Sequence, residues 1–439
     1  MTTVVAPPAA AAGRRGFRAA ILCFDADDQL IRISDGLMVV NNGLIEALGD
    51  YSTEITGYPA LVVTDWRGRT LAPGFIDTHV HYPQIDVIGS PADGLLPWLN
   101  DYTFPHESRF VDLGYAQSVA TVFLDELVRH GVTSAMVYCS SHPQSVDALM
   151  TQAKARGLRL VAGKCLMDSH SPDGVRDQTE QSLIDSEALI QRWHGVDRLG
   201  YALTPRFAPS CSMAQMDGAA QLARQYDGVS DGVWVQTHVA ENHDEIAWVK
   251  QLFPNERSYL AVYERFGLLR PKSVYGHCIY LDDNDRARMT ACGASAAVCP
   301  TSNLFLGSGL FDFRASERAK LSWGLASDVG GGTSLSPFHT MLAAFQIARL
   351  AGVSLSPQQL WYRHTLAAAR AIALDRQIGN LAVGLEADAV LLDDCATPLL
   401  ARRTGAAQSL AQWLFALIVL GDDRVISERL IAGEPVQFK

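Results

Sequence analysis

The chain has 439 residues and a formal net charge of −11, with 48% hydrophobic and 19% charged residues. This composition is typical of a soluble globular enzyme and excludes extensive disorder. The acidic balance excludes the basic surface that sequence-independent nucleic-acid binding requires. The longest apolar run, residues 413–420, is too short to cross a bilayer. We therefore expect neither a nucleic acid nor a membrane as a partner.

The cysteines and the N-terminal segment both favour a cytoplasmic protein. The 8 cysteines are scattered without Cys-x-x-Cys pairs, which favours buried thiols in a reducing compartment. Residues 1–18 are rich in Ala and Pro, and Arg14 and Arg15 follow the apolar residues, whereas a secretory signal places its positive charge first. We predict that residues 1–18 form a flexible tail.

Strand patterns lie near both ends of the chain. Residues 19–70 predict short strands and hairpins, and strand patterns return at residues 387–393 and 424–438. Neither end is long enough to build a core of its own. We therefore predict that residues 19–70 and 376–439 combine into one small β domain.

Between these ends, residues 71–375 alternate apolar strands with amphipathic helices. A first strand ends at His81, and further strands are expected at residues 132–138, 159–167, 198–208, 233–238, 273–277, 294–299 and 323–328. Helices are expected at residues 114–129, 177–194, 212–226, 282–292, 337–351 and 356–374. Eight such strands predict a parallel (β/α)8 barrel. A doubly wound open sheet is the alternative, but no Gly-x-Gly-x-x-Gly follows the first strand.

The first barrel strand ends in two histidines, His79 and His81. Residues two apart on a strand share a face, so both imidazoles point to one place beside the end of the strand. Two neutral imidazoles on a rigid element are suited to zinc or iron. An isolated His-x-His is more often two unrelated loop histidines, so the remaining strand ends decide its meaning.

Three of those strand ends carry further candidate ligands, namely His238, His277 and Asp328. Catalytic groups of a (β/α)8 barrel lie at the C-terminal ends of its strands. Taken singly, each has a structural explanation, as a hydrogen-bonded core histidine or a loop cap. Together they favour a metal site with room for a water, which zinc would activate for attack on an sp² carbon.

Glu241 lies three residues beyond His238 and is a candidate proton carrier. Attack on a ring C=N must be matched by protonation of the ring nitrogen, and a carboxylic acid beside the metal can supply that proton. The alternative is a solvated glutamate that opens a helix, which the neighbouring residues 242–244 (Asn-His-Asp) allow. The metal context favours the catalytic interpretation.

Several longer motifs resemble a known family. The motifs are residues 73–81, 81–84 (His-Tyr-Pro-Gln), 98–105, 204–208 (Thr-Pro-Arg-Phe-Ala), 237–242, 299–303 and 327–332. The first, with His238, His277 and Asp328, resembles the amidohydrolase superfamily. The Tyr-Pro-Gln and Pro-Arg-Phe motifs are more narrowly similar to the guanine deaminase family. The resemblance covers nearly the whole chain beyond residue 18.

The resemblance implies a hydrolase that deaminates guanine to xanthine and ammonia, by attack of a zinc-bound hydroxide on C2. It implies one Zn²⁺ per chain, with iron possible. The implied metal ligands are His79, His81, His238 and Asp328. The implied catalytic residues are Glu241 and Asp328 as proton carriers and His277, which orients the water. The implied substrate-binding residues are Gln84, Trp98, Asn100, Arg206, Phe207, His238, Glu241 and Asp328.

The sequence leaves four alternatives open. Lys164, in the expected third strand, is compatible with a two-metal site bridged by a carboxylated lysine. Another aminated heterocycle, such as a triazine, an 8-oxo-purine or cytosine, is an alternative substrate, and a non-catalytic protein on the same fold is a further alternative. The apolar residues 411–420 predict either a homodimer interface, as in related deaminases, or burial against the small β domain.

Overall fold

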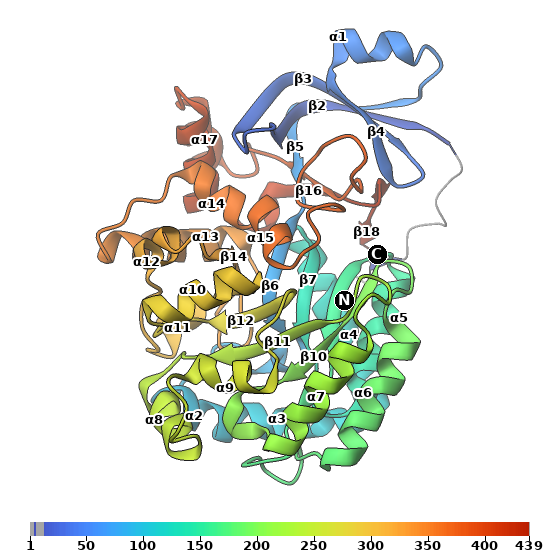
Figure 1. The fold of residues 1–439 in the computed structure, drawn as a ribbon. Coiled ribbons are helices and arrows are strands. Elements are labelled where there is room, and N and C mark those ends of the chain that lie inside the picture. The colour runs from blue at the N-terminus through green and yellow to red at the C-terminus, as the bar shows by residue number, and fades with distance from the viewer. Residues whose placement is uncertain (1–3, 6–12, 439) are drawn as a thin grey trace.

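The computed structural model describes residues 4–5 and 13–438 and contains a barrel and a smaller β domain (Figure 1). The barrel strands form a parallel sheet in the order β14-β13-β12-β11-β10-β8-β7-β6. Backbone hydrogen bonds close it, from Asp328 N to His79 O at 2.9 Å and from His81 N to Val329 O at 2.8 Å. The predicted (β/α)8 barrel is confirmed.

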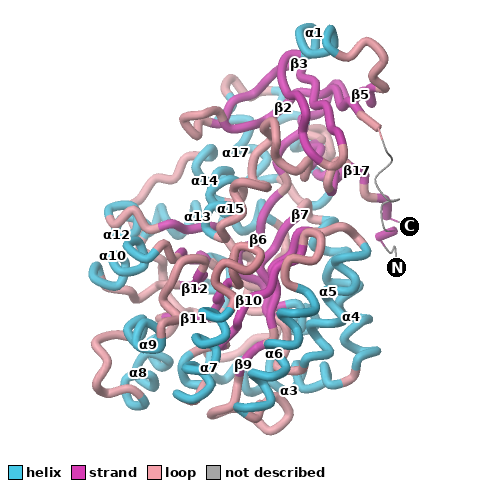
Figure 2. The backbone as a smooth tube through the Cα atoms, turned by 45° about the vertical axis from the view of Figure 1, so that its right-hand side comes forward, coloured by secondary structure: helices cyan, strands magenta, loops and turns pink. Residues whose placement is uncertain are grey.

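The barrel strands are almost entirely buried, because helices cover the outer face of the sheet (Figure 2). Parallel strands buried on both faces have continuous apolar runs without alternation, as this sequence does. The strands are β6 (Phe75–His81), β7 (Val132–Tyr138), β8 (Arg159–Gly163), β10 (Leu199–Pro205), β11 (Trp234–Val239), β12 (Ser273–His277), β13 (Ser295–Val298) and β14 (Ser322–Leu325). The helices that follow them are α4 (Leu113–Arg129), α5 (Pro143–Ala155), α6 (Thr179–Trp193), α7 (Met213–Gln225), α8 (His243–Leu252), α9 (Tyr259–Phe266), α10 (Asp283–Cys292), α11 (Pro300–Phe305), α12 (Phe313–Arg318), α13 (Pro337–Leu350), α14 (Pro357–Arg363) and α15 (Leu366–Ala371).

Three predicted elements are shorter or broken in the structure. The expected strand at residues 159–167 is interrupted at Lys164, with a separate short strand β9 (Cys165–Leu166) that pairs with β10. The expected last strand stops at Leu325, so Asp328 lies beyond it, with a left-handed φ of 49°. The expected helix at residues 356–374 divides into α14 and α15, because the chain turns at His364.

The small β domain is a seven-stranded sheet in the order β17-β16-β15-β5-β2-β3-β4. Its N-terminal strands are β2 (Arg15–Phe24), β3 (Leu30–Asn41), β4 (Leu44–Asp50) and β5 (Val63–Pro73), and its C-terminal strands are β15 (Ala389–Leu392), β16 (Ile426–Ile431) and β17 (Glu434–Pro435). β15 pairs antiparallel with β5, which joins the two ends of the chain in one sheet. The prediction of a composite β domain from both ends is confirmed.

The prediction of a flexible tail at residues 1–18 extends too far, because its last four residues are part of a strand. Residues 15–18 belong to β2, where Arg15 and Arg18 form ion pairs with Glu434 and Asp35 at 2.6 Å each. These cross-strand pairs anchor residues that the sequence alone suggested were free. β1 (Val4–Val5) pairs with β18 (Gln437–Phe438), and the rest of the tail, residues 1–3 and 6–12, lies outside the described residues.

Residues 82–112 form a series of short helical turns at the C-terminal end of the barrel, opposite the β domain (Figure 1). These are η2 (Tyr82–Val87), α2 (Leu95–Trp98), η3 (Leu99–Thr103), α3 (Phe104–Glu107) and η4 (Ser108–Val111). This end of the barrel carries the ends of the strands with the candidate ligands. The short turns therefore form part of the wall above them.

The apolar segment near the C-terminus folds as α17 (Leu410–Leu420), next to α16 (Pro398–Gly405). Phe415 packs against Phe345 of α13 with ring centroids 4.8 Å apart, and the Trp413 indole donates a hydrogen bond to Asp394 at 2.8 Å. One side of the helix, with Trp413, Leu414, Ala416, Leu417 and Ile418, is therefore buried within its own chain. Among residues 4–5 and 13–438, no helix is both long enough and apolar enough to span a bilayer.

Candidate active site

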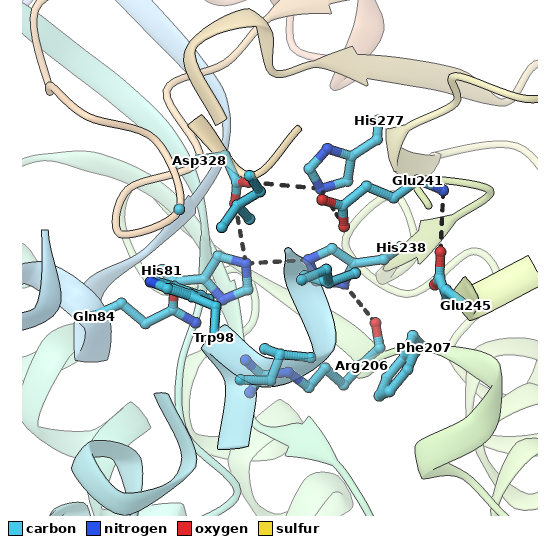
Figure 3. Close-up of a pocket in the computed structure, with 14 residues that line it drawn as sticks. His81, Gln84, Trp98, Arg206, Phe207, His238, Glu241, Glu245, His277 and Asp328 are labelled. Carbon is cyan, nitrogen blue, oxygen red and sulfur yellow. Dashed lines mark hydrogen bonds and ion pairs between the residues drawn. The ribbon is translucent and has the colours of Figure 1, made fainter. Parts of the chain in front are cut away.

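Four side chains at the C-terminal end of the barrel, His79, His81, His238 and Asp328, have the spacing of ligands around one ion. Figure 3 shows three of them, His81, His238 and Asp328. The Nε2 atom of His81 lies 3.2 Å from Nε2 of both His79 and His238. Oδ1 of Asp328 lies 3.1 Å from Nε2 of His79 and 3.4 Å from Nε2 of His81. Ligand atoms about 2.0–2.1 Å from a tetrahedral ion are about 3.3 Å apart. The cluster therefore fits a single metal ion.

His277 lies at the edge of this cluster. Donor atoms of His79, His238, His277 and Asp328 all fall within 4.8 Å of one another. Nε2 of His277 is nevertheless 3.6 Å from Oδ2 of Asp328, farther than His81 is from Oδ1. By these distances His81 is better placed than His277 to share an ion with Asp328.

The imidazoles of the cluster are held in the neutral form that binds metals. Burial lowers the pKa of His79, and it lowers the pKa values of His81 and His238 well below the ordinary range. Nδ1 of His238 donates a hydrogen bond to the backbone oxygen of Arg206 at 2.6 Å. This contact leaves Nε2 unprotonated and directed at the cluster, as a metal-binding histidine requires.

Glu241, His277 and Asp328 form the polar side of the pocket. Nε2 of His277 lies 3.2 Å from Oε2 of Glu241, and its Nδ1 donates to Oδ1 of Asn303 at 2.8 Å. His277 and Asp328 both have left-handed φ angles, 69° and 49°. This backbone conformation costs energy in residues other than glycine, and residues that adopt it are often found at functional sites. The local backbone therefore aims both side chains at the same point.

The environments of these three groups shift their pKa values in different ways. Burial raises the pKa of Glu241 to about 7, so this carboxyl can hold or release a proton near neutrality. Burial opposes the charge on Asp328, but the neighbouring His79 outweighs it and lowers the pKa of that carboxyl. Burial also disfavours charge on His277, but Glu241 and Asp328 outweigh it and raise its pKa.

A second buried network lies on the opposite side of the pocket. Nη1 of Arg206 forms an ion pair with Oε2 of Glu107 at 2.6 Å. Nε2 of Gln84 donates to the other oxygen of Glu107, Oε1, at 2.9 Å, and Oε1 of Gln84 accepts from Gly330 N at 3.2 Å. All three side chains are buried. Figure 3 shows Gln84 and Arg206 across the pocket from His277.

The remaining walls of the pocket are largely apolar. They are formed by Leu95, Trp98, Leu99, Phe207 and Leu306, and the pocket between them opens to solvent. Asn100, predicted to bind substrate, is exposed, and its amide donates to the backbone oxygen of Leu96 at 3.0 Å. The structure therefore does not bring Asn100 into the pocket, because the short turn after Trp98 directs it outward.

Comparison with known proteins identifies the family. Residues 70–436 match the amidohydrolase family. The chain is 42% identical to the guanine deaminase of Escherichia coli (strain K12) over 405 residues, 92% of this chain and 91% of that protein. The chain belongs to the amidohydrolase family.

Two solved structures of guanine deaminases share the fold of this amidohydrolase. The E. coli enzyme superposes with a TM-score of 0.94 at 39% identity, over 97% of this chain and 100% of that one. A guanine deaminase from C. acetobutylicum with guanine bound in its active site has a TM-score of 0.89 at 28% identity, with coverage of 97% and 100%. The resemblance to guanine deaminases expected from the motifs is confirmed.

The side chain of Lys164 in this amidohydrolase has its partners outside the cluster of histidines and Asp328. Its Nζ forms an ion pair with Oδ1 of Asp177 at 2.6 Å and donates to the backbone oxygen of Cys165 at 3.2 Å. The lysine is buried, so this partner is its main source of charge compensation. The geometry favours a site for one metal.

Sequence reasoning missed four polar residues of the site. They are Glu107, which joins Gln84 to Arg206, Asn303, which orients His277, Ser308, which donates to Oε1 of Glu241 at 2.8 Å, and Glu245, which lines the pocket. Glu107 ends the four-residue helix α3 and Ser308 lies in a loop, and neither segment is long enough to show a periodicity that marks a buried side. Asn303 belongs to the motif at residues 299–303, which directly follows β13, so its position after a strand end was an available signal.

Proposed function

We propose that this amidohydrolase converts guanine and water to xanthine and ammonia at one zinc ion. The observation that carries the proposal is the pairing of two groups in a single pocket. A three-histidine, one-aspartate cluster and the buried Gln84–Glu107–Arg206 network lie on opposite sides of one pocket, whose other walls are largely apolar. The identity of 42% to a guanine deaminase supports guanine as the substrate.

His79, His81, His238 and Asp328 would hold the metal ion. Bound zinc would lower the pKa of a coordinated water towards neutrality and polarise the carbon that the water attacks. Three imidazoles and one carboxylate at these spacings suit tetrahedral zinc, and iron is the alternative for the same ligands. The ion pair of Lys164 with Asp177 supports a count of one metal per chain.

Gln84 and Arg206 would bind the carbonyl edge of the purine, because both carry N–H donors and line the pocket. Trp98 and Phe207 would pack against the faces of the ring and exclude water from it. C2, which carries the amino group, is separated from C6 by one ring nitrogen, so a purine held at its C6 carbonyl by Gln84 and Arg206 would present C2 towards the metal ligands and Glu241.

Glu241 and Asp328 would carry the protons of the reaction. Asp328 would take one proton from the attacking water, while Glu241 would deliver its own proton to the ring nitrogen next to C2. Glu241 would then take the proton left on the added hydroxyl and pass it to the amino group, so that the C2 carbonyl forms as ammonia leaves. The proton held by Asp328 would finally return to Glu241. Glu241 has a pKa of about 7 from burial, which suits both accepting and delivering a proton. His277, 3.2 Å from Glu241 and 3.6 Å from Asp328, orients the water between them.

A homodimer and a cytoplasmic location complete the proposal. Leu399 of α16 and Val419 of α17 are 63% and 43% exposed, and a second copy of the chain would cover them. All 8 cysteines are free thiols, which supports a reducing compartment. Sedimentation equilibrium of the purified chain tests the dimer, and a monomer at micromolar concentration would contradict it.

The function is tested by incubating the purified protein separately with guanine, adenine, cytosine and ammeline and measuring the ammonia released. We expect ammonia from guanine, in equal amount with xanthine. Ammonia from none of the four would contradict the proposal. If ammonia is released faster from cytosine or ammeline than from guanine, that compound and not guanine is the preferred substrate.

A further inference from the structure

Glu107 is a buried carboxylate that contacts both of the residues proposed to bind the purine. It is the last residue of α3, whereas Gln84 comes from η2 and Arg206 from the segment after β10. Its two oxygens are divided between them, with Oε2 2.6 Å from Nη1 of Arg206 and Oε1 2.9 Å from Nε2 of Gln84. Glu107 and Arg206 are only 1% and 3% exposed.

These contacts allow only one orientation of the Gln84 amide. A carboxylate accepts hydrogen bonds and a backbone N–H donates them, so Nε2 must face Glu107 and Oε1 must face Gly330 N. The second N–H of Gln84 is thereby set by the plane of the amide. Without Glu107, the amide loses the acceptor that fixes its nitrogen and its direction.

The same carboxylate cancels the charge of Arg206. A buried guanidinium without a partner favours anionic ligands, whereas one that is already paired presents neutral N–H donors. Arg206 also lies over the ring of Phe104, with Cζ 5.2 Å from the centroid, which further restricts its plane. The pocket therefore offers a pair of fixed donors with no net charge, and this arrangement suits a neutral carbonyl.

We propose that Glu107 is a positioning residue that sets Gln84 and Arg206 to recognise the carbonyl at C6 of a neutral purine. It acts through these two side chains and determines which purines the pocket prefers. The proposal rests on the proposed function, since it assumes that purines bind in this pocket. It predicts that the loss of Glu107 selectively lowers the affinity for ligands with the C6 carbonyl.

The test compares two purines that the enzyme cannot deaminate. Hypoxanthine has the C6 carbonyl and purine lacks it, and neither carries an amino group at C2. Titration calorimetry of the metal-loaded protein measures both affinities for the wild type and for Glu107→Gln. We expect the variant to bind hypoxanthine at least about tenfold more weakly, from the loss of a charged hydrogen bond, with less than about a threefold change for purine.

Asp125→Asn is the matched control. Asp125 forms a buried ion pair with Arg156 at 3.0 Å, between α4 and the end of α5, and neither residue lines the pocket. Breaking it should lower the melting temperature, as Glu107→Gln does, while both affinities stay within about threefold of the wild type. If Glu107→Gln does not fold, Glu107→Asp keeps the charge but withdraws the carboxylate by one methylene, and the same selective loss is expected.

The outcomes separate this inference from the proposed function. The role of Glu107 is overturned if Glu107→Gln loses affinity for hypoxanthine and purine by the same factor. It is also overturned if the wild type does not bind hypoxanthine more tightly than purine. Absence of xanthine formation from guanine by the wild type overturns the proposed function, yet the binding comparison still decides on Glu107. With guanine, we expect KM to rise about tenfold in Glu107→Gln and kcat to change less, because the contact contributes to binding in both ground and transition states.

Discussion

Replacement of Glu241 by Gln removes one transferable proton from the pocket and changes little else. The amide oxygen can still accept from Ser308, which donates to Oε1 at 2.8 Å, and the amide nitrogen can face Nε2 of His277 where Oε2 lies at 3.2 Å. The side chain is buried, so its shape is set by these neighbours. The variant therefore isolates proton transfer from packing.

The expected loss follows from the chemistry of the carboxyl. With a pKa of about 7, Glu241 divides its time between both forms at neutral pH. A positioned acid or base of this kind contributes about 10²–10⁴-fold to the rate, or about 3–5 kcal/mol of transition-state stabilisation. We expect kcat for guanine to fall by that factor in Glu241→Gln, with KM changed only slightly.

The assay measures xanthine formation together with the metal content of each preparation. Metal should stay at the wild-type level, because Glu241 approaches the cluster only through His277. Glu245→Gln serves as the comparison, since Glu245 lines the same pocket and accepts from Glu241 N at 3.1 Å. Its loss should be at least about tenfold smaller. Retention of more than about a tenth of the wild-type kcat by Glu241→Gln would refute the proton-carrier role.

Three further predictions concern the metal and the pH dependence of folding. Asp328→Asn should lower the metal content after dialysis against a weak chelator, because it removes one of four ligands, and full retention would exclude Asp328 from the ligand set. Lys164→Met should leave the metal content unchanged but destabilise the fold by about 3–5 kcal/mol, because it leaves Asp177 buried and unpaired; loss of half the metal would indicate a two-metal site. Burial lowers the pKa of His364 from 6.5 to about 4, so the folded state favours the neutral ring. Its contribution of about 3 kcal/mol is complete above about pH 6.5 and is lost as the pH falls towards 4. His364→Asn should flatten that part of the pH dependence in denaturant unfolding, and an unchanged slope would contradict the assignment.

The sequence predicted the parts of the molecule in which apolar residues recur with the period of a strand or a helix. The barrel followed from apolar runs separated by helical patterns, and His79, His81 and His238 could be grouped because parallel strands end at the same edge. Asp328 was predicted at the end of the last strand. It lies beyond that strand, but the hydrogen bond from its backbone N to His79 O keeps it beside the histidines.

Residues on irregular segments could not be predicted in the same way. Asn100 points outward and Glu107 inward, although both lie in the short turns of residues 82–112, where no period distinguishes the two sides. Asp177, the partner of Lys164, lies 13 residues away in a loop, so the sequence left the lysine available for a second metal. Tertiary contacts settled each of these cases.

The most direct test of a single-metal guanine deaminase is a zinc titration of the metal-free protein with guanine turnover as the signal. The four ligands at 3.1–3.4 Å spacing predict that activity rises linearly and stops at one zinc per chain. A plateau at two zinc ions per chain would contradict the mononuclear site. Xanthine formation at the full rate before any zinc is added would contradict the account as a whole.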